Sequence, residues 1–245
     1  MSLAYMKPVV WSVQDGILVR DLKKSDCKAA LDFLKKWHLT SSVLLHTFNV
    51  KHCCSSLMSF FQIVYYIMKD ETSLLAIDDD TQEIVGVLVG KPMIRENWSW
   101  NFFRMLLPTN YVSQIIGNFE RDMVMAHVPN AEHRDPPSSY HVFAICLSPA
   151  YKGRNQKPRF LIDAYKVARS LGLPKLSFIG KSLNDQIRAS RIGMTEITKT
   201  CYGDYVDSNG EKLIKTYPSG QYYAIHFEMD VGPKCNMSIY ERRIE

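Results

Sequence analysis

Residues 140–194 constrain the fold of this chain most strongly, because they alternate strand, turn, helix, strand and helix. An apolar run at 140–147 predicts a buried strand, and Pro158 then opens an amphipathic helix that extends to about residue 171. A second short strand is predicted at 175–179, followed by a helix at 182–192. Strands that alternate with helices in this way are typical of a sheet with parallel neighbours.

The turn before the first of these helices is basic and reads Tyr-Lys-Gly-Arg-Asn-Gln-Lys-Pro at 151–158. The N-terminus of a helix presents backbone N–H groups without intrahelical partners, and cationic side chains surround it here. Such a turn predicts a binding site for a phosphorylated ligand. It lacks the additional glycines that phosphate-binding turns usually carry, so a solvated basic turn without a ligand is the alternative.

The rest of the chain adds hairpins and helices. Two apolar runs at 73–78 and 83–90 flank a short polar turn and predict a β-hairpin. Other strands are expected at 17–22, 195–200 and 221–229, and helices after Ser25-Asp26, within 40–50, at 55–68, and from a cap at Thr109 or Asn110 to about residue 126. Hairpins followed by strand–helix alternation predict a mixed twisted sheet flanked by helices, an α/β (α+β) class. We find no repeat or low-complexity linker, so residues 1–245 are expected to form a single domain.

Composition excludes several classes of protein. The net charge of +5 is mild, and no basic–aromatic stripe accompanies it, so nucleic acid is not the expected partner. Neither a membrane-spanning run nor the apolar core of a signal peptide is present. The cysteines are scattered without metal-ligand spacing, which predicts free thiols, no metal and a cytoplasmic protein. They are Cys27, Cys53, Cys54, Cys146, Cys201 and Cys235.

Several segments together resemble one known family. They are Phe-Leu-Lys-Lys-Trp at 33–37, the hairpin at 73–87, Leu-Ser-Pro-Ala-Tyr-Lys-Gly-Arg at 147–154, Lys-Ser-Leu at 181–183, Ile-Gly-Met at 192–194 and Tyr-Gly-Asp-Tyr at 202–205. In this order they resemble the GNAT superfamily of acetyl-CoA-dependent N-acetyltransferases. More narrowly, they are similar to the insect-type arylalkylamine N-acetyltransferases.

The resemblance implies a co-substrate, acetyl-CoA, bound in a wedge between two splayed strands. Its pantetheine arm would pair with the backbone of Ile145, Cys146 and Leu147. Its pyrophosphate would lie on the amides of Lys152, Gly153, Arg154, Asn155, Gln156, Lys157 and Pro158. A small amine then attacks the thioester directly, so the enzyme positions two reactants and manages two protons. We expect a monomer or a weak dimer.

The chain departs from the family in its cofactor turn. The family pattern is Arg/Gln-x-x-Gly-x-Gly/Ala, and here Lys152, Asn155 and Lys157 occupy the patterned positions. Glycine avoids crowding the phosphates there, and Asn155 replaces the first glycine with a residue that tolerates left-handed dihedrals. Lys157 either adds a phosphate contact or pushes the cofactor away.

A second departure concerns the general base. Ser42 stands where the family carries its catalytic glutamate, and we expect it on the substrate side of the site. His46, one helical turn further on, is the candidate replacement base, with a hydrogen-bonded structural histidine as the alternative. Ser182 matches the family serine close to the thioester sulfur, and it equally suits a helix N-cap. The tyrosine that often protonates the thiolate would fall near Ala189. These departures leave two functions open: an N-acetyltransferase, or an inactive GNAT-fold protein that binds CoA or a partner.

Overall fold

In the part of the chain that the structure describes, eight strands form one continuous sheet at the centre of the molecule. The structure is a computed structural model that describes residues 7–94, 110–126, 138–151 and 156–232. The sheet order is β1-β2-β3-β4-β5-β6-β8-β7. The strands are β1 (Val10–Gln14), β2 (Ile17–Asp21), β3 (Leu74–Asp78), β4 (Ile84–Met93), β5 (Ser139–Leu147), β6 (Lys175–Gly180), β7 (Thr195–Cys201) and β8 (Tyr223–Asp230).

The sheet is mixed, as the sequence predicts, because β5 and β6 are parallel while the other neighbours are antiparallel. The β5–β6 ladder runs only from Tyr140↔Leu176 to Val142↔Phe178. On its other side β5 stays paired with β4 as far as Leu147, and β6 stays paired with β8 as far as Gly180. The two parallel strands therefore separate beyond Val142 and open a wedge in the middle of the sheet.

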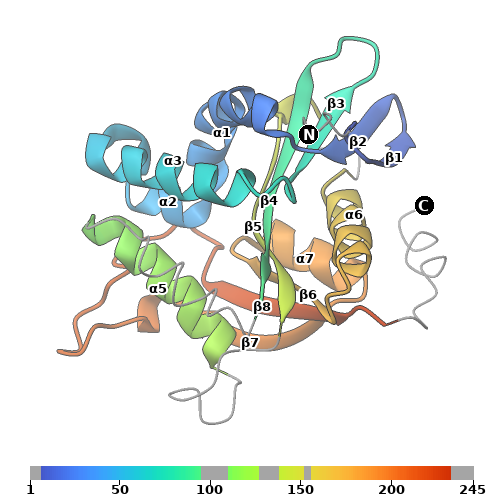
Figure 1. Cartoon of the computed structure of the whole chain (residues 1–245). Helices are drawn as coiled ribbons and strands as arrows, with labels where there is room; N and C mark the ends of the chain where they lie inside the picture. Colours follow the sequence, from blue (N-terminus) through green and yellow to red (C-terminus); the bar gives the residue numbers. More distant parts are fainter. Residues whose placement is uncertain (1–6, 95–109, 127–137, 152–155, 233–245) are drawn as a thin grey trace.

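Helices cover both faces of the sheet (Figure 1). One face carries α1 (Cys27–Ser41), α2 (Val43–Thr47), α3 (Cys54–Met68) and α5 (Tyr111–Met125), and the other carries α6 (Gln156–Ser170) and α7 (Leu183–Arg191). Each face has its own apolar core. Phe143 and Cys146 of β5 contribute to the first core, whereas Val142, Ile145 and Leu147 contribute to the second. Burial on both faces explains why residues 142–147 of β5 form an uninterrupted apolar run.

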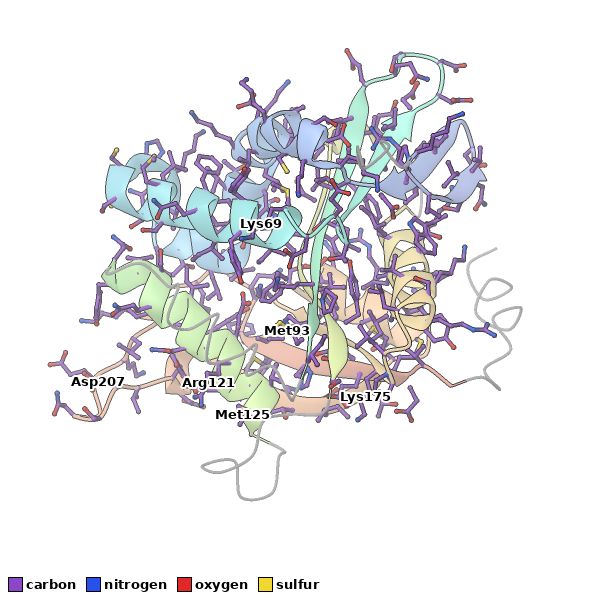
Figure 2. The ribbon with its side chains drawn as sticks, in the orientation of Figure 1. Lys69, Met93, Arg121, Met125, Lys175 and Asp207 are labelled. Carbon is purple, nitrogen blue, oxygen red and sulfur yellow. The ribbon has the colours of Figure 1, made fainter. Side chains whose placement is uncertain are left out.

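Side chains fill the space between the helices and the sheet (Figure 2). Met93 at the end of β4 belongs to the first core, whereas Arg121 on α5 keeps part of its side chain exposed. Within the described residues, no helix is both long enough and apolar enough to cross a membrane.

Three local predictions need correction. The sequence does not predict strand β1, because its burial does not alternate. It is an edge strand, and its Ser12 hydroxyl donates a hydrogen bond of 2.6 Å to the Asp163 carboxylate of α6. Helix α6 begins at Gln156 rather than at Pro158, and proline is tolerated in the first turn because N–H groups there have no intrahelical acceptor. The Asp26 carboxylate accepts the N–H of Lys23 at 2.8 Å instead of capping α1. The predicted cap of α5 is confirmed at Asn110.

Candidate active site

The wedge between β5 and β6 contains a narrow gap that reaches the inside of the molecule. Phe143, Ala144 and Ile145 line it from β5, and Phe178 and Ile179 line it from β6. The Phe143 carbonyl faces this gap, because it accepts a hydrogen bond of 3.0 Å from the Lys181 ammonium just beyond β6. An interrupted ladder with backbone acceptors facing it is a place where an extended ligand chain can pair as an additional strand. The wedge therefore fits the pantetheine arm that the resemblance implies.

An apolar cavity lies on the side of the wedge covered by α2, α3 and α5. Aliphatic and aromatic side chains make up most of its wall: Leu44, Leu45, Val50, Phe60, Ile63, Val64, Ile67, Val89, Ile116 and Phe143. The cavity is small, about 80 Å³. Apolar walls with few polar groups are typical of small-molecule sites, but such sites usually measure roughly 300–1,000 Å³, so side chains of the wall must move apart before this cavity admits an organic ligand.

An open groove of about 400 Å³ lies on the other side of the wedge. His46, Leu147, Ser182 and Arg188 are among the residues that line it. Arg188 is 3.7 Å from Asp185 and points a cation toward this face. A groove with a cation and hydroxyl groups at the mouth of the wedge suits a long polar ligand.

Ser42 lines all three spaces, the cavity, the gap and the groove. It occupies this junction because α1 ends at Ser41 and the chain bends through extended backbone at Ser42 (φ −82°, ψ 128°) before α2 begins. A group at this position is close to where a molecule in the cavity would meet a molecule in the wedge.

Two other predicted site residues come to the same place. Ser182 lines both the gap and the groove, and it is the N-cap of α7, where its hydroxyl accepts the Asp185 N–H at 3.2 Å. That hydroxyl also donates to the Asp185 carboxylate at 2.7 Å. His46 is exposed and lines only the groove, with its backbone N–H donating to the Ser42 carbonyl at 3.0 Å. The structure thus brings Ser42, His46 and Ser182 together, while their roles stay predictions.

The predicted cofactor residues are placed in part. Ile145 lines the gap and Leu147 lines the groove. The Cys146 side chain is buried in the first core, on the face of the sheet that α1, α2, α3 and α5 cover. Lys152, Gly153, Arg154 and Asn155 lie outside the described residues. Helix α6 begins immediately afterwards, at Gln156. Gln156, Lys157 and Pro158 therefore form the first turn of this helix, where the backbone N–H groups of Gln156 and Lys157 are available to an anion and Pro158 has no N–H to offer.

Two aromatic residues of α3, Tyr65 and Tyr66, do not line the cavity. Tyr65 is largely exposed, and Tyr66 packs its ring against the ammonium groups of Lys69 and Lys91. The opposite side of the same helix supplies Phe60 and Ile63 to the cavity instead. The aromatic run at 98–103 lies outside the described residues.

Sequence reasoning missed the most distinctive polar feature of the cavity. Glu120 of α5 is 7% exposed and forms an ion pair of 2.5 Å with Lys181, and both residues line the cavity. A signal was available in the helix pattern, because Ser113, Gly117 and Glu120 follow one another at helical spacing on the buried side of α5. A carboxylate within such a stripe is uncommon without a partner or a function.

Solved structures resemble this fold closely. A mosquito arylalkylamine N-acetyltransferase-like 5b protein superimposes with a TM-score of 0.72 at 19% identity, over 87% of this chain and 99% of that one. A Drosophila melanogaster polyamine N-acetyltransferase, which forms N-acetylagmatine, gives 0.71 at 18% identity, over 87% and 99%. Arylalkylamine N-acetyltransferase 2 from Aedes aegypti gives 0.72 at 14% identity, over 89% and 100%.

These similarities confirm the predicted fold. The chain has the GNAT fold, in the form seen in insect arylalkylamine and polyamine N-acetyltransferases. No protein-family model and no curated protein sequence matches the chain. At these identities the likeness establishes the fold, and function has to be argued from the site.

Proposed function

We propose that this protein is an acetyl-CoA-dependent N-acetyltransferase that acetylates a small primary amine, with arylalkylamines as the favoured class. The observation that carries the proposal is the junction at Ser42, where an apolar cavity meets the wedge between β5 and β6. Two ligands that approach from the groove and from the cavity would meet there. Direct transfer needs this arrangement, because its main requirement is that the amine and the thioester lie within reach of each other.

The apolar wall supports the choice of acceptor. Phe60 and Phe143 offer aromatic faces, and aliphatic side chains complete the enclosure. An arylalkylamine would widen the cavity on entry, bury its ring against this wall and present its nitrogen to the polar end of the cavity. The named relatives acetylate amines of this kind or polyamines, which is consistent with an amine acceptor.

Residues around the junction would handle the two protons. The Ser182 hydroxyl lies at the mouth of the gap and is held by Asp185, so rotation toward the wedge would offer it to the leaving sulfur. His46, on the groove side, is one candidate for the base that removes the amine proton. The hydroxyl of Ser42 is a weak base, so it would orient the reactants without taking the proton.

The experiment has two parts. Isothermal titration with acetyl-CoA should give micromolar-range binding, and a thiol-release assay over a panel of amines should then detect CoA. The absence of CoA release with every amine of the panel would contradict the proposed function, whether or not acetyl-CoA binds. His46→Ala tests the assignment of that histidine, because unchanged turnover would remove it from the mechanism.

A non-catalytic protein is the second candidate, and the substitution at Ser42 favours it. Loss of the glutamate removes the group to which the family resemblance assigns proton abstraction. A protein of this kind would bind acetyl-CoA in the titration and release no CoA with any amine. The two candidates are therefore separated by the second part of the experiment.

A further inference from the structure

A buried carboxylate stands at the end of the acceptor cavity that borders the wedge. On the basis of the proposed function, we propose that Glu120 binds the amine and accepts its proton in place of the missing glutamate. We further propose that Lys181 beside it restricts the acceptor to monoamines with an apolar body. The inference rests on where the Glu120–Lys181 pair lies and on what surrounds it.

The pair connects the cavity to the wedge. Glu120 Oε1 lies 2.5 Å from Lys181 Nζ, and the same ammonium donates to the Phe143 carbonyl at 3.0 Å. Lys181 lines both the cavity and the gap between the strands, whereas Glu120 lines the cavity. A nitrogen bound to Glu120 would consequently be close to the point where a thioester in the wedge opens toward the cavity.

The carboxylate has capacity for a second cation. An ionised carboxylate has two oxygens and accepts several hydrogen bonds, so Glu120 can hold an ammonium while it keeps Lys181. Buried ion pairs of this kind contribute little net stability, because desolvation offsets much of their attraction. A functional reason for placing one in an apolar cavity is therefore more economical than a purely structural one.

The same pair predicts which amines are rejected. Glu120 is the one carboxylate among the described residues that line the cavity, so the cavity offers one site for one ammonium. A second cation on the acceptor would lie against Leu45, Val50 and Ile67, where no counter-charge is available among the described lining residues. Burying an unpaired charge against an apolar wall is strongly unfavourable, which disfavours diamines and polyamines.

The reaction balances with Glu120 as the proton acceptor. The amine arrives as an ammonium and gives one proton to the Glu120 carboxylate. The freed nitrogen lone pair forms the N–C bond to the thioester carbonyl carbon, the C–S bond breaks and its electron pair leaves on sulfur. The second proton lost from nitrogen goes to the thiolate, and the proton on Glu120 returns to solvent. The products are the N-acetylated amine and CoA.

Other titratable groups face Glu120 and must be distinguished from it. Lys181 pairs with it, and His38 of α1 lines both the cavity and the gap. Tyr202 packs against Phe119 of α5 with ring centres 5.6 Å apart, and burial raises the pKa of its hydroxyl, with the charges of Asp185 and Glu120 adding to this. Asp185 lines the gap, whereas Glu120 is the one carboxylate among the described residues that line the cavity, so replacing Glu120 separates its role from those of the others.

The test compares Glu120→Gln with Glu196→Gln, a matched change at an exposed residue of β7. The probes are 2-phenylethylamine as the monoamine and 1,4-diaminobutane as the diamine. We expect Glu120→Gln to lower kcat/KM for the monoamine by about 100-fold or more, to lose the acidic limb of the pH–rate profile, and to keep the Kd for acetyl-CoA. Glu196→Gln should retain all three values. Lys181→Gln should raise the diamine-to-monoamine ratio of kcat/KM by about tenfold, because the competing cation is removed.

Several results would overturn the inference while leaving the proposed function intact. One is a Glu120→Gln variant within about threefold of the unaltered protein with the same pH profile. Another is a His38→Gln variant that loses the acidic limb while Glu120→Gln keeps it. A third is an unaltered protein that acetylates the diamine as efficiently as the monoamine. If Glu120→Gln does not fold, the double variant Glu120→Gln/Lys181→Gln removes both charges and should fold without activity; activity in that variant would also refute the assignment.

Failure of the proposed function itself has a different signature. It would appear in the unaltered protein, as no binding of acetyl-CoA in the titration or no release of CoA with any amine. The inference would then fall with it, whereas the results above all require a working unaltered enzyme.

Discussion

The Glu120–Lys181 pair also determines how stability should respond to Lys181→Met. The variant keeps the buried carboxylate, which is 7% exposed, and removes its cation. A glutamate titrates near pH 4.3 in an unfolded chain, so holding it protonated in the folded protein at pH 7 costs about 3.7 kcal/mol. Holding it ionised without a partner costs at least as much, in line with roughly 3–5 kcal/mol for a broken buried pair. We therefore expect the free energy of unfolding to fall by about 3–4 kcal/mol, and Tm by roughly 6–16 °C.

The pH dependence of this loss tests the reasoning further. If Glu120 is protonated in the folded variant, folding takes up a proton above pH 4.3, so the deficit shrinks by about 1.4 kcal/mol for each unit that the pH falls toward that value. Urea unfolding of both proteins between about pH 5 and 7.5 measures this deficit. An m-value equal to that of the unaltered protein would show that unfolding of the variant exposes the same amount of surface. Lys28→Met, at an exposed pair with Asp32, is the control and should cost less than about 0.5 kcal/mol. A loss below about 1 kcal/mol at pH 7 would refute burial of the carboxylate, whereas a loss of about 3–4 kcal/mol that does not change with pH would refute its protonation in the variant.

Three further predictions concern other parts of the molecule. Burial holds the pKa of His141 well below its ordinary value of 6.5, so below that pH the unfolded chain binds a proton that the folded protein does not. The free energy of unfolding should therefore decrease below about pH 6.5 by up to about 1.4 kcal/mol per pH unit. Urea titrations should show a smaller slope for His141→Gln. Hydrogen bonds from neighbouring serine side chains lower the pKa of Cys53 to about 7. The rate at which iodoacetamide modifies Cys53 should therefore rise with pH and reach half of its maximum near that value. Mass spectrometry should show that this fast reaction is lost in Cys53→Ser and kept in Cys54→Ser. Asp163 is fully buried and accepts a hydrogen bond from Ser12 of the edge strand. In thermal unfolding, Asp163→Ala should lower the free energy of unfolding by about 3 kcal/mol or more. The control is Asp32→Ala, at the exposed pair with Lys28, which should change it by less than about 0.5 kcal/mol.

The fold was predictable wherever burial imposes a period on the sequence. Strand β5 and helix α6 were placed because an apolar run and an amphipathic stretch flank a turn, and the structure has both. Strand β1 was missed because both of its faces are largely exposed and its pairing partner β2, not its own pattern, holds it in the sheet. The wedge was not predictable from local pattern either, since the residues of β5 are buried on both sides of Val142.

The site was predictable only where the family resemblance supplied a position. It led to Ser42 and Ser182, and the structure brings them to one junction although they are far apart in the chain. It could not lead to Glu120, because the resemblance marks where a carboxylate is expected and says nothing about one that arrives from another helix. What allows a carboxylate to act at a site is its position in space, whichever helix carries it. Here α5 brings Glu120 to the cavity wall from the side opposite α1 (Figure 1). Loss of an acid at one sequence position is therefore weak evidence for loss of the chemistry, until every element that surrounds the cavity has been considered.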